Sequence, residues 1–365
     1  MSTIARLFEY IEVNPKETLP KGTIARKISM DKLQPFIKDI PEYELAEFSG
    51  GAKFRNGDTI MARITPCLEN GKTAMVNNLE PDGIGFGSTE FIVFRAKVGC
   101  TDPDFVYYLV CSPFVREPAI KSMVGSSGRQ RVQTDVIANL EIDFPSLLEQ
   151  TKIASVLKSL DDKIAHNTTI NENLEQQAQA IYQSMFVSTL NGTDRTGLLS
   201  ELIAVKYGKD HKKLNDGIYP VYGSGGIMRY VEKPIYEKES VLIPRKGSLN
   251  NVMYVDEPFW SVDTMFYTEM KIPNVAKFVY HFVKSKDLIS LNAGSAVPSM
   301  TTDILNSMEV RIPSVERLAE FEGLVAPLYR AIKDNISQSK SLAALRDTLL
   351  PKLMNGEIDV SEVKI

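Results

Sequence analysis

Two stretches of the chain place apolar residues at alternating steps of four and three, the heptad pattern of a helix that packs along another long helix. A helix of about 40 residues, the length of each stretch, is about 60 Å long. The predicted seam comprises Ile153, Leu157, Leu160, Ile164, Leu174 and Ile181 in the first stretch, and Phe321, Val325, Leu328, Ile332, Leu342 and Leu349 in the second.

The two stretches belong to an internal repeat. Residues 135–146 resemble residues 303–314, and the same offset continues through both heptad stretches. It aligns Asn167 with Asn335 as polar seam positions, which typically fix the register of paired helices. Further upstream, residues 105–110 resemble residues 278–283 at a slightly larger offset. Two unrelated amphipathic helices are the alternative interpretation, but one constant offset favours a duplicated unit.

The remaining segments predict globular domains with short strands between Gly-rich turns. Expected strands lie at residues 59–64, 91–94, 240–244 and 251–255, and residues 191–197 are expected to form a flexible join. The chain therefore divides into a first domain (1–146), a long helix (147–187), a second domain (188–314), a second long helix (315–356) and a tail (357–365).

Composition narrows the class of protein. The chain is 43% hydrophobic and 24% charged, with a net charge of −4, so it is not a uniformly basic nucleic-acid coat. No apolar run reaches the roughly 18 residues of a membrane span, and the three cysteines show no zinc-binding spacing. These features predict a cytoplasmic protein with reduced thiols.

No sequence motif predicts catalysis or a metal site. Gly71-Lys72-Thr73 has Pro66 where a phosphate-binding loop needs glycine, and residues 83–87 fit a tight turn better than a dinucleotide fingerprint. The three histidines lie far apart. Asp161-Asp162-Lys163 has the carboxylates and lysine that a nuclease site needs, but its position within a predicted helix indicates a charged outer face.

Several loops carry side chains that suit DNA. Specific binding needs cationic and amide groups that reach phosphates and base edges, and residues 125–133 concentrate such groups between glycines. The counterpart loop, residues 294–300, has no cation. A lone surface cation is more often simply solvated, so the prediction concerns clusters. The candidate DNA contacts are Lys53, Arg55, Arg63, Lys72, Ser126, Ser127, Arg129, Gln130, Arg131, Tyr222, Ser224, Arg245, Lys246, Ser248 and Asn250.

Nearly the whole chain resembles the DNA-specificity subunits of Type I restriction–modification systems. The resemblance rests on the alternation of domains and helices and on local segments in both halves. These segments are residues 53–58, 63–72 and 87–91 in the first half, and residues 217–226, 243–248, 258–264 and 349–358 in the second.

The resemblance implies an α+β fold, with two mixed α/β target-recognition domains separated by two antiparallel coiled-coil helices in a pseudo-twofold repeat. It implies a non-catalytic subunit whose domains each read one half of a split double-stranded DNA target. The helices would set the spacing and recruit two modification subunits, which bind S-adenosylmethionine and methylate adenine. Restriction subunits would add ATP- and Mg-dependent cleavage, so this chain itself would need no cofactor.

One departure from the family pattern is the short lead before Asn14, which predicts an incomplete opening strand. Two other functions remain open on the residues alone. One is a self-contained DNA-modifying enzyme, and the other is a coiled-coil scaffold that does not bind DNA.

Overall fold

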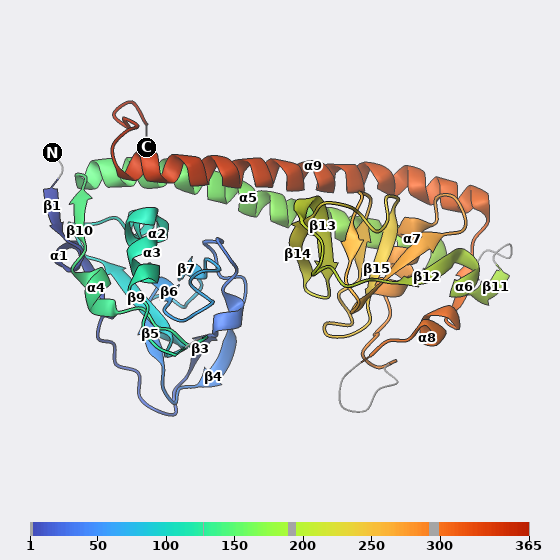
Figure 1. The fold of residues 1–365 in the computed structure, drawn as a ribbon, viewed down its shortest axis with the longest axis horizontal. Coiled ribbons are helices and arrows are strands. Elements are labelled where there is room, and N and C mark those ends of the chain that lie inside the picture. Colours follow the sequence, from blue (N-terminus) through green and yellow to red (C-terminus); the bar gives the residue numbers. More distant parts are fainter. Residues whose placement is uncertain (1–2, 127, 189–194, 292–298, 365) are drawn as a thin grey trace. The chain divides into compact units, whose positions relative to one another are not determined.

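The computed structural model describes residues 3–126, 128–188, 195–291 and 299–364 (Figure 1). They form two compact units, Met1–Thr168 with Ile336–Ile365, and Thr169–Asn335. Each unit contains one mixed domain together with part of each long helix. These helices are α5 (Leu147–Tyr182), which continues as a π-helical segment (Gln183–Ser188), and α9 (Val315–Met354). No helix of the described residues is long and apolar enough to cross a membrane.

The first domain contains a two-stranded antiparallel ribbon, β1–β10, and two four-stranded sheets, ordered β2-β9-β6-β7 and β4-β3-β8-β5. Only the β3–β8 pairing is parallel among these. The elements are β1 (Thr3–Arg6), α1 (Leu7–Tyr10), β2 (Ile11–Val13), β3 (Ile24–Ile28), the 3-10 helix η1 (Met30–Lys32), β4 (Glu44–Glu47), β5 (Ala52–Phe54), β6 (Thr59–Ala62), β7 (Thr73–Met75), β8 (Gly85–Gly87), β9 (Phe91–Ala96), α2 (Pro103–Cys111), α3 (Pro113–Lys121), α4 (Thr134–Ala138) and β10 (Glu141–Phe144).

The second domain has the ribbon β11–β19, the sheet β12-β18-β15-β16 and the sheet β14-β13-β17, in which β13 and β17 are parallel. Its elements are β11 (Arg195–Leu198), α6 (Leu199–Leu202), β12 (Ile203–Tyr207), β13 (Asp216–Gly223), β14 (Gly226–Val231), β15 (Ser240–Pro244), β16 (Met253–Val255), β17 (Trp260–Ser261), β18 (Met265–Met270), α7 (Ala276–Lys284), α8 (Thr302–Asn306) and β19 (Glu309–Ile312).

The two domains therefore have the same fold. The ribbons correspond, the sheets correspond strand for strand apart from β5, and helices α2 and α4 correspond to α7 and α8. The repeat detected in the sequence is confirmed, and it extends through strands whose sequences do not resemble each other.

Continuous apolar runs explain the central strands. All of β6 and β15 is buried, as are the first four residues of both β9 and β18. Strands covered on both faces have such runs rather than alternation. The helix α2 that covers the first sheet begins with Pro103 at its first turn, and the Asp102 carboxylate accepts a hydrogen bond from the Phe105 backbone N–H at 3.0 Å. Both features favour helix initiation.

Each unit has two hydrophobic clusters, one within the domain and one that the domain shares with its helix segments. In the first unit, Phe105 and Phe144 of the domain share a core with Leu157 of α5 and Leu353 of α9. In the second unit the corresponding core joins Phe278 and Val279 to Tyr182, Phe321 and Val325. Every predicted seam residue is buried or half-buried.

Within each unit the two helix segments run antiparallel. In the first unit, Asp161 pairs with Arg346 and the later Asn167 pairs with the earlier Ser339, its Nδ2 donating to Ser339 Oγ at 3.1 Å. In the second unit, Asn335 Nδ2 donates to Asn171 Oδ1 at 2.9 Å. The predicted polar seam positions thus bond across the helix pair in both units.

The prediction that Asp161 lies on a charged outer face of the helix was wrong. Asp161 lies 2.6 Å from the Arg346 guanidinium and accepts a hydrogen bond from the Tyr108 hydroxyl at 2.7 Å. Arg346 is only 7% exposed. Asp161 follows the seam residue Leu160, so it lies on the flank of α5 that meets α2, where a buried carboxylate needs a cationic partner.

Three local predictions also failed. The opening strand is complete, because β1 pairs with β10 over four residues, as β11 does with β19. Residues 195–197 of the predicted join form part of β11, although residues 191–194 lie outside the described residues. The predicted turn at residues 83–87 contains the strand β8, which is parallel to β3.

The shared core predicts unequal effects of two substitutions on α9. Phe321 is fully buried among Tyr182, Phe186 and His281, whereas Leu324 on the same helix is half exposed. Phe321→Ala should lower the free energy of unfolding by about 3–5 kcal/mol, and Leu324→Ala by about 0.5 kcal/mol or less. Urea denaturation measures both, and equal losses would contradict the shared core.

Candidate nucleic-acid interface

Two candidate arginines occupy the same place in the two domains. Arg63 directly follows β6, and its backbone N–H donates to Glu90 O at 2.9 Å, just before β9. Arg245 directly follows β15, and its backbone N–H donates to Thr264 O at 2.9 Å, just before the corresponding strand β18.

A loop segment forms a backbone hydrogen bond with the carbonyl of each arginine. In the first domain Val132 N donates to Arg63 O at 2.8 Å, and in the second Met300 N donates to Arg245 O at 2.9 Å. The preceding residues, Arg131 and Ser299, form the corresponding β-bridges to Ile64 and Lys246. We call these places the arginine junctions: Arg63, Glu90 and Arg131 in the first domain, and Arg245, Thr264 and Ser299 in the second.

The first arginine junction has two guanidinium groups around one carboxylate. Arg131 Nε lies 3.0 Å from both Glu90 carboxylate oxygens, and Arg131 Nη2 lies 2.6 Å from Glu90 Oε1. Arg63 Nε lies 3.9 Å from Glu90 Oε2. The hydrogen bonds from Arg131 hold the pKa of Glu90 below its ordinary value. The side chains of Arg63, Glu90 and Arg131 are 32%, 23% and 46% exposed, so a ligand can reach all three.

The second arginine junction has a different electrostatic character. Arg245 donates to Asp263 O at 3.0 Å and lies over the Tyr207 ring, 5.6 Å from its centroid. The loop that follows Arg245 is tied to the β13–β14 turn, because Asn251 Nδ2 donates to Ser224 O at 2.8 Å. Arg245 is half-buried.

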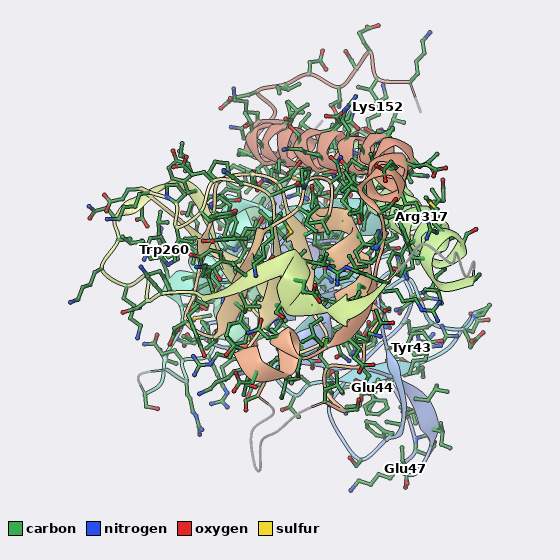
Figure 2. All side chains as sticks on the ribbon, turned by 90° about the vertical axis from the view of Figure 1, so that its right-hand side faces the viewer. Tyr43, Glu44, Glu47, Lys152, Trp260 and Arg317 are labelled. Carbon is green, nitrogen blue, oxygen red and sulfur yellow. The ribbon has the colours of Figure 1, made fainter. Side chains whose placement is uncertain are left out.

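A hollow beside the first arginine junction brings further cations to the surface. Its lining includes Lys16, Lys53, Arg63 and Thr89, together with Glu17. Lys16 was not predicted, because it stands alone in the sequence between Pro15 and Glu17. By contrast, the edge strand β4 exposes Glu44 and Glu47 (Figure 2). Because acidic groups repel phosphates, β4 is the less favourable of the two surfaces for an anion, whereas the Glu17 carboxylate in the hollow is paired with Arg55 and Arg95.

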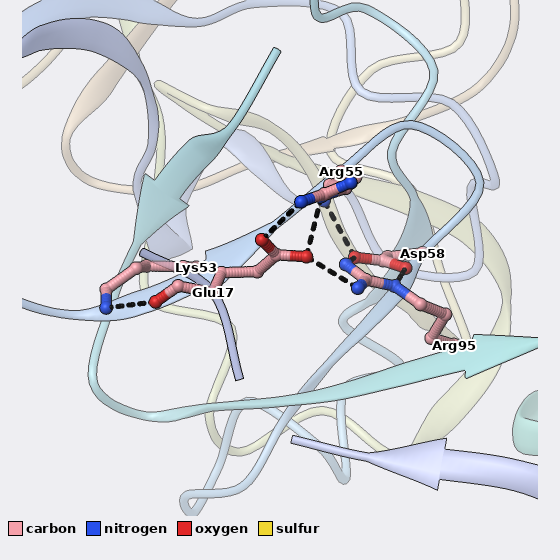
Figure 3. Close-up of polar contacts among 5 residues, drawn as sticks. All are labelled: Glu17, Lys53, Arg55, Asp58 and Arg95. Atoms are coloured by element: carbon pink, nitrogen blue, oxygen red, sulfur yellow. Dashed lines mark hydrogen bonds and ion pairs between the residues drawn. The ribbon is translucent and has the colours of Figure 1, made fainter. Parts of the chain in front are cut away.

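Two candidate DNA contacts are engaged within the domain (Figure 3). Lys53 Nζ donates to the Glu17 carbonyl at 2.6 Å, and Arg55 Nε lies 2.6 Å from the Glu17 carboxylate. Arg95 on β9 binds Asp58 with two hydrogen bonds of 2.7 Å and Glu17 with one of 2.6 Å. The network fastens the segment around Glu17 to β5 and β9.

The carboxylate of Glu17 is held in its ionised form. Burial alone would raise its pKa, but the hydrogen bonds and charges of Arg55 and Arg95 outweigh burial and hold the pKa below its ordinary value of 4.5. The side chain is only 4% exposed. This network was not predicted, because Glu17, Asp58 and Arg95 are far apart in the chain and show no local pattern.

The other candidates are dispersed in the first domain. Lys72 donates its ammonium hydrogen to Met30 O at 2.9 Å rather than reaching the junction. Gln130 precedes the junction residue Arg131, and its backbone carbonyl accepts a hydrogen bond from Thr65 N at 3.0 Å. Ser126 and Arg129 are exposed, and Ser127 lies outside the described residues.

The candidates of the second domain are divided between the loop after Arg245 and strand β13 with the turn that follows it. Lys246 and Ser248 are exposed in the loop after Arg245, while Asn250 donates to Asp287 Oδ1 at 3.3 Å. Tyr222 is half-buried, with its hydroxyl 3.4 Å from Glu257. Of the counterpart loop, residues 294–300, only Ser299 and Met300 fall within the described residues.

The described residues contain no cluster of histidine, cysteine and acidic side chains that could hold a metal ion. His281 illustrates a structural role. Its Nδ1 lies 2.7 Å from Gln179 Oε1 and its Nε2 lies 3.0 Å from the Tyr329 hydroxyl. Burial lowers the pKa of His281 to about 4, so the ring is neutral at neutral pH.

Comparison with known proteins agrees with this architecture. A family model described as "Type I restriction modification DNA specificity domain" matches residues 11–176 and 199–319. The MjaIX specificity subunit of Methanocaldococcus jannaschii is 24% identical over 303 residues, covering 71% of this chain and 70% of that protein. The HindI specificity subunit of Haemophilus influenzae is 22% identical over 435 residues, covering 88% and 90%.

A solved structure has the same fold. The S subunit of a Type I restriction–modification system from M. genitalium superimposes with a TM-score of 0.55 at 19% identity, covering 97% of this chain and 96% of that one. The chain belongs to the family of Type I restriction–modification DNA-specificity proteins. Its part is therefore recognition of DNA rather than catalysis.

The Glu17 network predicts a pH-dependent loss of stability. Because the folded-state pKa of Glu17 lies below 4.5, its stabilising contribution is complete above that pH and is lost as the pH falls through the folded-state value. Glu17→Gln should thus destabilise the protein at pH 7, with the difference from wild type shrinking below about pH 4.5. Urea denaturation across this range measures it, with Glu237→Gln as an exposed control; a pH-independent difference would refute the assignment.

Proposed function

We propose that this chain reads a two-part, asymmetric target in double-stranded DNA, with one half contacted by each domain. The supporting observation is that one fold occurs twice and carries an arginine at the same backbone position in both copies, Arg63 and Arg245. The groups around the two arginines differ, which favours two different half-sites. The exposed candidates near each junction supply further phosphate and base contacts.

In this proposal α5 and α9 form an antiparallel coiled-coil spacer between the two target-recognition domains. A spacer of fixed length raises the effective concentration of the second half-site once the first is bound, so two weak contacts become one tight contact. The antiparallel pairing within each unit supports this role. In this proposal the chain comprises two target-recognition domains (1–146 and 188–314), two spacer helices (147–187 and 315–356) and a tail (357–365).

The partners follow from the same proposal. Two modification subunits would bind the helical regions and methylate adenine with S-adenosylmethionine, and restriction subunits would cleave DNA with ATP and Mg. This chain would supply no cofactor and would act on DNA in the cytoplasm. The relatives named as specificity subunits of restriction enzymes support this assembly.

A self-contained DNA-modifying enzyme is the first alternative. The proposal predicts that the purified chain alone transfers no methyl group from labelled S-adenosylmethionine to duplex DNA, because the sequence has no Asn/Asp-Pro-Pro-aromatic motif of the kind that amino-methyltransferases carry. Scintillation counting of the DNA measures transfer. Incorporation that persists after repurification would favour the alternative.

A shorter spacer should shorten the gap in the DNA target. Removing one heptad from both α5 and α9 shortens the helix pair by about 10 Å and rotates each helix face by only about 20°. The distance corresponds to about three base pairs at about 3.4 Å per pair. Selection of bound duplexes from a random pool should therefore recover the same half-sites about three pairs closer together.

The matched control inserts one heptad in both helices and should lengthen the gap by the same amount. An unchanged gap in both variants would refute the spacer. Failure of the wild-type chain to enrich any two-part motif would instead favour the second alternative, a scaffold that does not bind DNA.

A further inference from the structure

We propose that the side chains which differ between the two arginine junctions read bases, whereas the arginine common to both contacts the DNA backbone. The reading side chains are Glu90 and Arg131 in the first domain and Thr264 and Ser299 in the second. The inference rests on the proposed function and assigns roles within that binding surface.

The two arginine junctions share their backbone contacts and differ in their side chains. Both junctions have the same two backbone hydrogen bonds and the same β-bridge, and the side chains at corresponding positions are all at least partly exposed. A contact shared by two domains that read different half-sites carries no sequence information, as is typical of phosphate contacts. Arg63 and Arg245 meet this description, so specificity must come from neighbours that differ.

Glu90 and Arg131 together form a base-reading pair. An ionised carboxylate only accepts hydrogen bonds, so it suits the exocyclic amino group of cytosine or adenine. A guanidinium only donates, so it suits O6 and N7 of guanine. The two-point contact between Arg131 and Glu90 fixes the donor and acceptor side by side, and both side chains retain exposed atoms.

The second domain offers different chemistry at the same positions. Thr264 carries a hydroxyl that both donates and accepts, together with a methyl group that can contact the methyl of thymine. Ser299 replaces the guanidinium of Arg131 with a short hydroxyl side chain. The second half-site should therefore lack the guanine preference that Arg131 imposes on the first.

The test uses the full-length chain and a random duplex pool, comparing enriched motifs of wild type, Glu90→Gln, Arg131→Lys and Thr264→Val. Glu90→Gln keeps the shape of the side chain but adds donors. Discrimination should fall roughly tenfold to a hundredfold at one or two positions of the first half-site, with the second half-site unchanged. Thr264→Val should do the reverse. In each variant the unaffected half-site also shows that the protein is folded.

Arg63→Gln and Arg245→Gln are the matched controls. Each should weaken binding to all sequences alike, leave the motif unchanged, and reduce the slope of log affinity against log salt by about 1.

Different failures have different meanings. A uniform loss of affinity with an unchanged motif in Glu90→Gln and Arg131→Lys would mean that this pair only fastens the loop, and would overturn the inference while leaving the proposed function intact. A changed motif in Arg63→Gln would overturn the backbone role. Absence of any two-part motif with the wild-type chain would overturn the proposed function, and this inference with it.

Discussion

Burial of one apolar core between a domain and two helix segments is the constraint on which each unit depends. In the first unit the helix residues Leu157 and Leu353 complete a core that the domain begins with Phe105 and Phe144. In the second unit Phe321 lies in the same relation to the domain. Since interiors are close-packed, a domain cannot shift on its helix segments without opening cavities. The packing therefore orients each arginine junction relative to the helices of its own unit.

The sequence predicted the features that follow from the spacing of apolar residues along the chain. Heptads identified the seam, and the repeat aligned Asn167 with Asn335, which both bond across their helix pair. A local sequence pattern does not reveal which side chains or strands pair when they are far apart in the chain. Asp161 was misassigned because its partner Arg346 is 185 positions away, and the strand β11 was taken for a loop because its extended conformation depends on pairing with β19.

The candidate site was predicted in its residue types but not in its symmetry. Arg63 and Arg245 were both named as DNA contacts, yet their surrounding sequences do not reveal that they are equivalent; only the strand pairing does. Residue type also could not show which cations bind carboxylates or carbonyls of their own domain. Lys53 and Arg55 bind Glu17 and Arg131 binds Glu90, while the side chains of Arg55 and Arg131 stay similarly exposed, at 48% and 46%.

The central claim is that one fold, present twice, reads two different half-sites on one duplex. Hydroxyl-radical footprinting of the wild-type chain on its selected duplex tests this most directly. The account predicts two protected segments of different sequence separated by an unprotected spacer, with protection of only one segment on a duplex in which the other half-site is scrambled. A single continuous footprint, or loss of both segments together at every protein concentration, would contradict it.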